Sequence, residues 1–239
     1  KQYIKLRSFP LDIEKDKEEI LKIMNSEAYY PIKEVLVYQS ASKPFEVREP
    51  LLKAALQTND IKVRQAVAST VTNIPELFRE KYETLLYDKS YETQEIALFN
   101  LWKSFPQHQK RYLEIAKNWI GFENKNLRLL YLSLSFLTSQ DTKEKSKAYT
   151  ELLSYTGTNN DSSLQQNALE RLMNLKIYNE AVFRSLAYGT GNHRWQFVKF
   201  SKDTIRKLIK EPKYKEVFTK IKDDLPIREK TQLQRLLEE

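Results

Sequence analysis

The sequence predicts an all-α fold, an α-solenoid of antiparallel helix pairs, and three observations lead to this prediction. Good helix formers dominate the 239 residues, which include only 4 Gly and 8 Pro. A nine-residue pattern with apolar residues at helical spacing recurs along the chain. A residue that can cap a helix stands three positions before most of these copies. Because such arrays grow in one direction without a single central core, the length does not require two domains.

The sequence predicts a connecting segment over residues 1–11 and a single helical repeat domain over residues 12–239. The one candidate strand is a short stretch in "KQYIKL". Next, "DIEKDKEEILKIM" and "PIKEVLVYQSA" predict a helix pair, and "FEVREPLLKAALQ" predicts a further helix. Since the chain starts at Lys1 without a Met, we expect a mature product or an excised piece.

The repeated helices are expected to begin at equivalent places. Their cores are "VRQAVASTV", "TQEIALFNL", "LRLLYLSLS", "LQQNALERL" and "FVKFSKDTI". These cores start at Val63, Thr93, Leu127, Leu164 and Phe197, at intervals of 30, 34, 37 and 33 residues. The predicted caps of the first four copies are Asp60, Ser90, Asn124 and Asp161. In the fifth copy Arg194 occupies this position, and Asn192 is the better cap.

Second helices are expected between the repeated ones, so that each unit is a helical hairpin in a right-handed stack of about six pairs. They are predicted over residues 76–87, 107–120, 142–155, 179–188 and 212–224. Pro75 and Pro106 open two of these segments, where the missing N–H of a proline is harmless.

Two helical repeat families have periods close to the observed one. The tetratricopeptide period is about 34 residues, but its Trp, Gly and Pro signature is missing here. A polar cap followed by a Val-Arg pair is typical of HEAT repeats, and "DIKVRQAV", with Val63 and Arg64, resembles that pattern closely. The intervals are shorter than the usual HEAT period. We therefore predict a HEAT/ARM-like superhelix.

The residue inventory leaves few options for chemistry within this chain. There is no Cys, so disulfides, thiolate metal sites and cysteine nucleophiles are excluded. His108 and His193 are the only histidines and belong to no H-E-x-x-H segment, so we expect surface imidazoles. No G-x-S-x-G elbow is present, and the lone G-x-G at Gly189 and Gly191 fits a helix cap. We predict no catalytic residue, cofactor or metal in this chain, and no membrane span.

The three tryptophans are expected to pack in the core, although they have the ring type that stacks on nucleic-acid bases. Trp102 falls on an apolar stripe with Leu98 and Phe105. The same expectation is extended to Trp119 and Trp195.

Positive charge is concentrated near the C-terminal end. Residues 194–222 contain ten Lys or Arg against three acids, which gives +7 of the net charge of +8. A solvated helix face is the favoured interpretation, and a patch that binds an anion, a nucleic acid or a partner is the alternative. The candidate contact residues are Arg194, Lys199, Lys202, Arg206 and Lys207.

Two stretches resemble a known family. "NSEAYYPIKEVLVYQSASKPFEVREPLLKAALQTNDIKVRQAVA" and "SYETQEIALFNLWKSFP" are similar to the C-terminal helical domain of zinc-dependent aminopeptidases related to aminopeptidase N, in the form found in Bacteroidetes-type bacteria. The similarity extends over roughly residues 12–210. It implies a non-catalytic module that closes over an upstream catalytic domain of the same polypeptide and limits the entry of peptide substrates.

In that family the zinc-binding H-E-x-x-H helix and a G-x-M-E-N strand belong to the catalytic domain, and neither motif occurs here. The resemblance therefore implies zinc only in an upstream domain. It implies a periplasmic or cell-envelope location for a bacterial aminopeptidase, and otherwise a cytoplasmic one. Arg194 or Arg206 would then favour peptides with a free C-terminus by attracting the terminal carboxylate.

Two other functions stay open. HEAT-like alkylpurine DNA glycosylases are also helical and basic, and they hold DNA in a basic groove with aromatic residues and a catalytic Asp. Here the charge lies at one end rather than along all repeats, so nucleic acid is not the expected partner. A scaffold that binds a protein partner through its curved face is the third possibility.

Overall fold

The protein is all-α in the computed structural model, which describes residues 15–117 and 124–239. These residues form fourteen α-helices and four short 3-10 helices, and no strand lies among them. The predicted all-α class is therefore confirmed. The candidate strand in "KQYIKL" lies outside the described residues.

The chain divides into two compact units, Lys1–Trp119 and Ile120–Glu239. Each is a set of helical hairpins and is described separately. The predicted connecting segment over residues 1–11 lies outside the described part, and the single domain over residues 12–239 stays a prediction.

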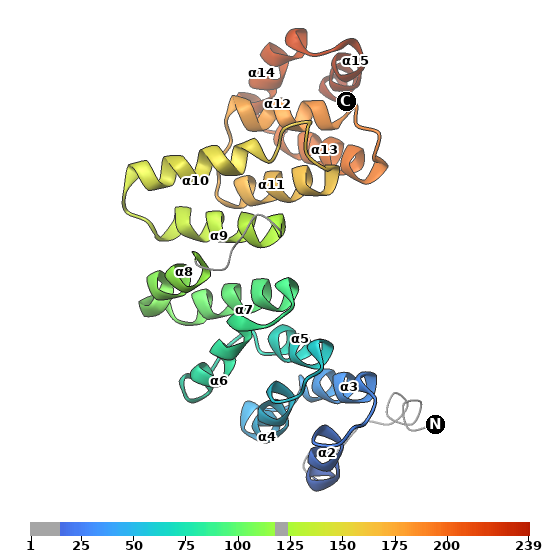
Figure 1. The fold of residues 1–239 in the computed structure, drawn as a ribbon. Helices are drawn as coiled ribbons and strands as arrows, with labels where there is room; N and C mark the ends of the chain where they lie inside the picture. Colours follow the sequence, from blue (N-terminus) through green and yellow to red (C-terminus); the bar gives the residue numbers. More distant parts are fainter. Residues whose placement is uncertain (1–14, 118–123) are drawn as a thin grey trace. The chain divides into compact units, whose positions relative to one another are not determined.

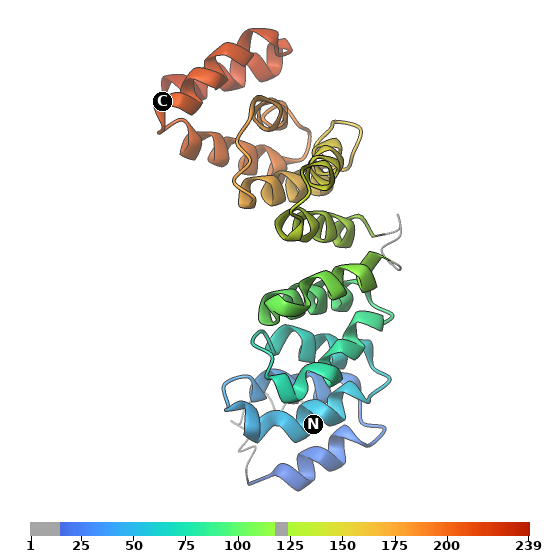
Figure 2. The same ribbon diagram turned by 90° about the vertical axis from the view of Figure 1, so that its left-hand side faces the viewer.

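Unit 1 contains the helices α2 to α8 (Figures 1 and 2). Their bounds are α2 Lys17–Met24, α3 Tyr30–Ser40, α4 Phe45–Leu56, α5 Ile61–Thr70, η1 Glu76–Phe78, α6 Arg79–Glu83, η2 Thr84–Tyr87, α7 Tyr91–Ser104, η3 Pro106–His108 and α8 Gln109–Lys117. α3, α5 and α7 contact one another in succession and form one layer. α2, α4 and α6 form the other, and side chains of α8 bond to α6.

Unit 2 contains the helices α9 to α15 (Figures 1 and 2). Their bounds are α9 Lys125–Thr138, α10 Thr142–Ser154, α11 Ser162–Asn174, α12 Glu180–Gly189, α13 Trp195–Leu208, α14 Pro212–Ile221, η4 Lys222–Asp224 and α15 Ile227–Glu238. α9, α11, α13 and α15 follow one another in one layer, and α12 contacts α14 in the other. The core includes Leu169, Phe183, Phe197, Phe218 and Leu233.

The repeat register is regular. Each of Val63, Thr93, Leu127, Leu164 and Phe197 is the third residue of its helix, and each is buried. Arg64, which completes the Val-Arg pair, donates to the carbonyl of Thr58 at 2.7 Å and to the carboxylate of Asp88 at 2.5 Å. Arg128 at the same position in α9 binds both oxygens of Glu151 in α10. In α5 and α9 this second position of the core therefore ties the helix to a neighbouring segment.

Two of the predicted caps are wrong. Ser90, Asn124 and Asp161 accept a hydrogen bond from the first turn of their helices. Asp60 does not, and its carboxylate instead lies 3.9 Å from Lys33 of α3. In the fifth copy Arg194 is the residue at the cap position, because Asn192 accepts from the Arg194 N–H and so fixes the turn before the helix.

The second helices differ from the prediction at one place. The segment expected as a helix over residues 76–87 is two 3-10 turns around the short α6. It buries Phe78, Tyr82, Leu85 and Leu86, whose spacing would place all four on one face of a regular helix, so the prediction followed their pattern but not the backbone. The segment expected over residues 107–120 is α8, and residues 118–120 lie outside the described part.

α15 has no counterpart among the predicted helices. It follows Pro226 and buries Leu233 and Leu236. The core expectation for tryptophan also needs correction. Trp195 is 68% exposed at the first position of α13, while Trp102 is half-buried and Trp119 lies outside the described residues.

Candidate functional site

Most of the predicted basic contact residues are paired within unit 2. Arg206 donates from Nε and Nη2 to the two carboxylate oxygens of Glu239, at 2.6 and 2.8 Å. Lys199 donates to Asp203 at 2.7 Å, and Lys202 donates to Gln232 of α15 at 2.6 Å. Lys207 is exposed and has no partner within the described part of the chain.

Two further lysines of this segment follow the same pattern. Lys220 pairs with Glu216 at 2.7 Å, and Lys213 pairs with Glu211 at 3.1 Å. Lys220 lowers the pKa of Glu216, and the Arg206 guanidinium lowers the pKa of Glu239. Several of the basic side chains therefore have an acidic neighbour on the protein surface, which supports the interpretation as a solvated face.

Arg194 and Arg206 do not share a site. Twelve residues of α-helix separate them, which is about 18 Å along the axis of α13. Arg206 is held at the end of α15 by Glu239. Arg194 stands at the start of α13 and faces α11.

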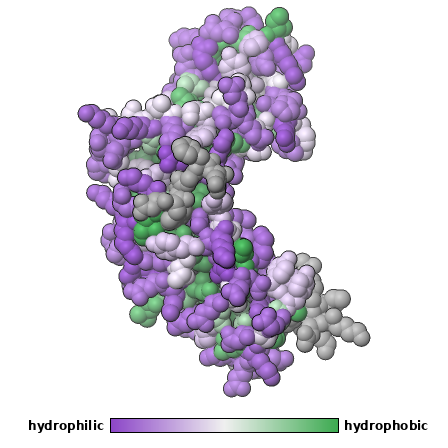
Figure 3. Space-filling view, viewed as in Figure 1, coloured by the Kyte–Doolittle hydropathy of each residue, from purple (hydrophilic) through white to green (hydrophobic). Residues whose placement is uncertain are grey.

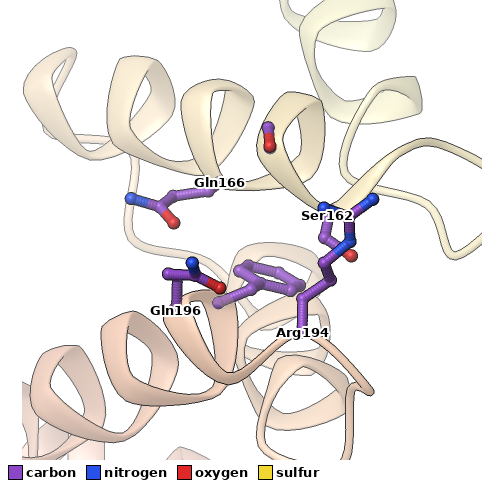
Figure 4. A pocket seen from close by; sticks show the side chains of 6 residues that line it. Ser162, Gln166, Arg194 and Gln196 are labelled. Atoms are coloured by element: carbon purple, nitrogen blue, oxygen red, sulfur yellow. The ribbon is translucent and has the colours of Figure 1, made fainter.

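A pocket of about 160 Å³ lies between the first turns of α11 and α13. It is lined by Ser162, Ser163, Gln166, Arg194, Gln196 and Phe197. In Figure 4 the side chains of Gln166 and Gln196 approach each other from the two helices, and Arg194 extends toward Ser162. The buried ring of Phe197 gives this otherwise polar pocket an apolar wall.

The backbone around Arg194 is fixed by a small network. The Arg194 N–H donates to Oδ1 of Asn192 at 2.9 Å, and the Ser162 hydroxyl donates to the same oxygen at 3.0 Å. The loop before α13 is thereby attached to the start of α11. This interaction is not visible in the sequence, because Ser162 and Asn192 are 30 residues apart.

The Arg194 guanidinium itself is held loosely. Its Nη2 lies 3.7 Å from Oδ2 of Asp161, which exceeds a hydrogen-bond distance, and both side chains are more than half exposed. Asp161 accepts from the Ser163 N–H at 2.8 Å. This backbone hydrogen bond and the nearby Arg194 lower the pKa of Asp161. The carboxylate therefore stays ionised and serves mainly as the cap of α11.

The other residues with potential for chemistry are dispersed. No group of three or more His, Asp or Glu side chains in residues 15–117 and 124–239 is arranged to hold a metal ion. His193 is exposed, but His108 is half-buried against the rings of Phe105 and Tyr112, so the expectation of a surface imidazole is wrong for His108. Across the described residues no helix has the length and apolar character needed to cross a membrane.

The visible surface is mostly hydrophilic, with apolar residues in small separate patches (Figure 3). Of these lining residues, Arg194 is a sequence-predicted contact, whereas Gln166, Gln196 and Ser163, which come from two different repeats, are not. Gln196 and Ser163 each stand one position before a repeat anchor, Phe197 and Leu164. That shared position was a usable signal, because equivalent residues of adjacent repeats lie next to each other.

Comparisons with known proteins identify no family for this chain. No protein-family model matches the sequence, and no curated protein matches it. One similar solved structure is described as the crystal structure of an engineered protein. It is 14% identical, with 95% of this chain and 96% of that chain covered, and the TM-score is 0.40. Similarity at this level supports no inference about function.

Proposed function

We propose that this chain is a non-catalytic helical repeat module that binds polypeptide. The observation that carries the proposal is the alignment of equivalent helices within each unit. The position before the repeat anchor is exposed in every copy, and the helices that carry it contact one another in succession within each unit. The residues are Lys62 and Glu92 in unit 1, and Asn126, Ser163 and Gln196 in unit 2.

The spacing of these side chains suits an extended polypeptide. Packed helices lie about 8–10 Å apart, and an extended chain advances about 3.3–3.6 Å per residue. A segment that crosses a layer therefore meets one polar side chain about every three residues. Neighbouring helices are close enough for such bridging, because Asn167 of α11 donates to Asn126 of α9 at 2.9 Å. Side-chain amides both donate and accept, as peptide groups do.

The resemblance to aminopeptidase N-related enzymes extends this proposal. In that setting the partner is an upstream catalytic domain of the same polypeptide, zinc belongs to that domain, and the bound polypeptide is the peptide substrate. The module limits which peptides reach the catalytic zinc. What supports this extension is the sequence similarity of residues in α3 to α5 and in α7.

One experiment tests the extension in the full-length protein. The coding sequence upstream of Lys1 is expected to contain an H-E-x-x-H segment. The combined substitutions N126A, S163A and Q196A are expected to change the dependence of cleavage rate on peptide length. They are expected to leave hydrolysis of a single aminoacyl chromogenic substrate unchanged. A missing H-E-x-x-H segment, or an identical length profile in both forms, would contradict the aminopeptidase extension.

The proposal that this chain is non-catalytic can be tested on the chain alone. Purified chain is expected to contain no stoichiometric zinc and to release no product from an aminoacyl substrate. Metal analysis and a chromogenic assay measure both. Activity that persists through repurification would contradict the proposal.

Binding to DNA is the main competing function, and its salt dependence distinguishes it. A protein that neutralises several phosphates loses about 10³-fold or more in affinity over a modest rise in salt. Because most of the basic residues of α13 and α14 are paired, we expect only weak binding of duplex DNA. Tight binding with a steep salt slope, or release of an alkylated base, would favour the glycosylase function instead.

A further inference from the structure

We infer that the pocket between α11 and α13 binds a carboxylate group of a polypeptide and that Arg194 recognises its charge. The inference rests on the proposed function, since it specifies which chemical group of a bound polypeptide this pocket recognises. The observations that carry it are the uncommitted guanidinium of Arg194, the free polar side chains beside it, and the size of the pocket.

The charge of Arg194 is available to a ligand. A guanidinium has five N–H donors, and within the described residues no acceptor lies at hydrogen-bond distance from those of Arg194. Its neighbour Asp161 is 3.7 Å away, and the two side chains are 56% and 58% exposed. An exposed and separated pair of this kind contributes little. A carboxylate that accepts two parallel N–H bonds from Arg194 would be the better partner.

Arg206 provides an internal comparison. It lies on the same helix and already makes the two-bond contact with Glu239 that Arg194 lacks. The structure thus distinguishes two arginines that the sequence analysis treated alike. Arg194 is the one with donors left for a ligand.

The pocket is held in shape before any ligand arrives. The Arg194 N–H and the Ser162 hydroxyl both donate to Asn192, so the loop before α13 cannot move independently of α11. Gln166 donates to Glu170 at 2.9 Å, which leaves its carbonyl oxygen free. A site that is already ordered loses less entropy on binding.

Further donors surround the space. The side-chain amide of Gln196 lines the pocket and has no partner among the described residues, whereas the hydroxyl of Ser163 bonds to Asp161. The N–H groups of Gln196 add to those of Arg194 as donors for an oxygen ligand. The wall formed by Phe197 suits the carbon atoms that bear the carboxylate.

Charge favours a carboxylate over a phosphate. The pocket of about 160 Å³ admits the carboxylate of a side chain or of a chain end. The Asp161 carboxylate nearby offsets part of the charge of Arg194. A phosphate with about two negative charges would need more positive charge than this pocket provides.

The test is an NMR titration of the isotope-labelled chain with three N-acetylated alanine-based tetrapeptides. The first has a free C-terminus, the second is amidated, and the third is amidated and contains one Glu. We expect saturable shifts of the Gln166 and Gln196 side-chain amide signals with the first or third peptide and none with the second. Binding of the first alone identifies a chain-terminal carboxylate, and binding of the third identifies an acidic side chain.

Two matched variants decide whether Arg194 is responsible. R194Q is expected to weaken binding by about tenfold or more, because it removes the charge and the paired donors. K207Q removes one charge from an unpaired lysine on the same helix and is expected to change affinity by less than about twofold. Both residues are exposed, so both variants should keep the circular dichroism spectrum and unfolding midpoint of the parent chain.

Equal losses in R194Q and K207Q would overturn the inference, as would the absence of saturable shifts at Gln166 and Gln196. Shifts at other positions show whether the pocket alone fails or whether the proposed polypeptide binding fails as well. Shifts confined to Asn126 and its neighbours on α9 and α11 would contradict the pocket alone. A chain that responds to none of the three peptides at any position would count against both.

Discussion

At the scale of single residues, one repeat anchor differs from the other four. Val63, Leu127, Leu164 and Phe197 are apolar, whereas Thr93 buries a hydroxyl. The Oγ1 atom of Thr93 has no hydrogen-bond partner among the described residues. A buried polar atom without a partner loses its hydrogen bonds to water and gains none in the protein. The Thr93 hydroxyl therefore lowers the stability of the folded state.

Replacing Thr93 by Val is therefore expected to stabilise the protein. The substitution keeps the β-branched shape and removes the unpaired hydroxyl, and we expect a gain of about 1 kcal/mol in the free energy of unfolding. Urea titration followed by circular dichroism measures it. S90A is the matched control, since it removes the cap that accepts from the Thr93 N–H and should cost about 1 kcal/mol. A T93V protein less stable than the parent would show that the hydroxyl is bound.

Individual residues also show where sequence reasoning reached its limit. The anchors are predictable because burial at helical spacing leaves a periodic pattern in one segment. The cap at Asp60 was predicted wrongly because Lys33, from another repeat, lies beside it. Trp195 was expected in the core but is exposed, because no other segment covers it. Arg48 shows the same dependence on distant residues, since it is buried and donates to Thr70 from 22 residues away.

At the scale of elements, α12 and α13 cross with very little space between them. A Cβ atom added to Gly189 of α12 would lie 2.1 Å from Oγ of Ser201, which is itself fully buried and unpaired in the described part. Two small residues thus set the closest approach of the two helices. The sequence analysis assigned Gly189 only to a helix cap.

We expect G189A to destabilise the protein by about 1–3 kcal/mol, because the added methyl group forces α12 and α13 apart. Adding S201G to G189A should recover part of this loss, because removing the Ser201 side chain makes room for the new methyl group. S201A alone should be close to neutral, since the hydroxyl it removes has no partner. Unfolding of the three variants in urea measures these effects, and a G189A protein of parent stability would contradict the packing.

A charged cluster joins α6 to α8 in unit 1. Glu83 accepts from Arg79 at 2.9 Å, from Arg111 at 2.8 Å and from the Tyr112 hydroxyl at 3.0 Å. Burial alone would raise the pKa of Glu83, but the hydrogen bonds from Arg111, Tyr112 and Arg79 outweigh it and lower this pKa below 4.5. Burial, followed by Glu83, raises the pKa of Tyr112 to about 12.

The lowered pKa of Glu83 predicts a pH dependence of stability. A depressed carboxyl pKa stabilises the folded state at pH values above the unfolded-state pKa, and this contribution is lost as the pH falls through the folded-state pKa. The free energy of unfolding should therefore decrease below about pH 4.5. In E83Q this part of the decrease should be absent, while stability at pH 7 is lower. Equal pH slopes in both proteins between pH 5 and 3 would contradict the assignment.

Prediction at the element scale succeeded for helices with an apolar stripe and a cap, such as α9 and α11. It failed for α15, whose segment is rich in Arg, Glu and Gln and covers the stack with only two fully buried leucines. It also failed for the segment around α6, where the positions of Phe78 and Tyr82 are set by contacts with other helices. The Tyr82 hydroxyl donates to the carbonyl of Ala68 in α5, and Asn100 of α7 bonds to both groups.

At the scale of the whole molecule, the protein consists of two helical units, and in each unit one layer of equivalent helices exposes the residue before every anchor. The sequence contains the repeat that generates these positions, but the pocket beside Arg194 depends on how α11 and α13 pack. That packing brings together residues 162–166 and 194–197, which are distant in the chain.

The most direct test of the central claim is an NMR map of polypeptide binding on this chain. A long unstructured polypeptide is added to the isotope-labelled protein, and the backbone and side-chain amide shifts are assigned to positions. If the exposed layer binds polypeptide, shifts are expected at Asn126, Ser163 and Gln196, which stand one position before the anchors of α9, α11 and α13. Shifts restricted to the lysines near the ends of α13 and α14, or no shifts at saturating polypeptide, would contradict it.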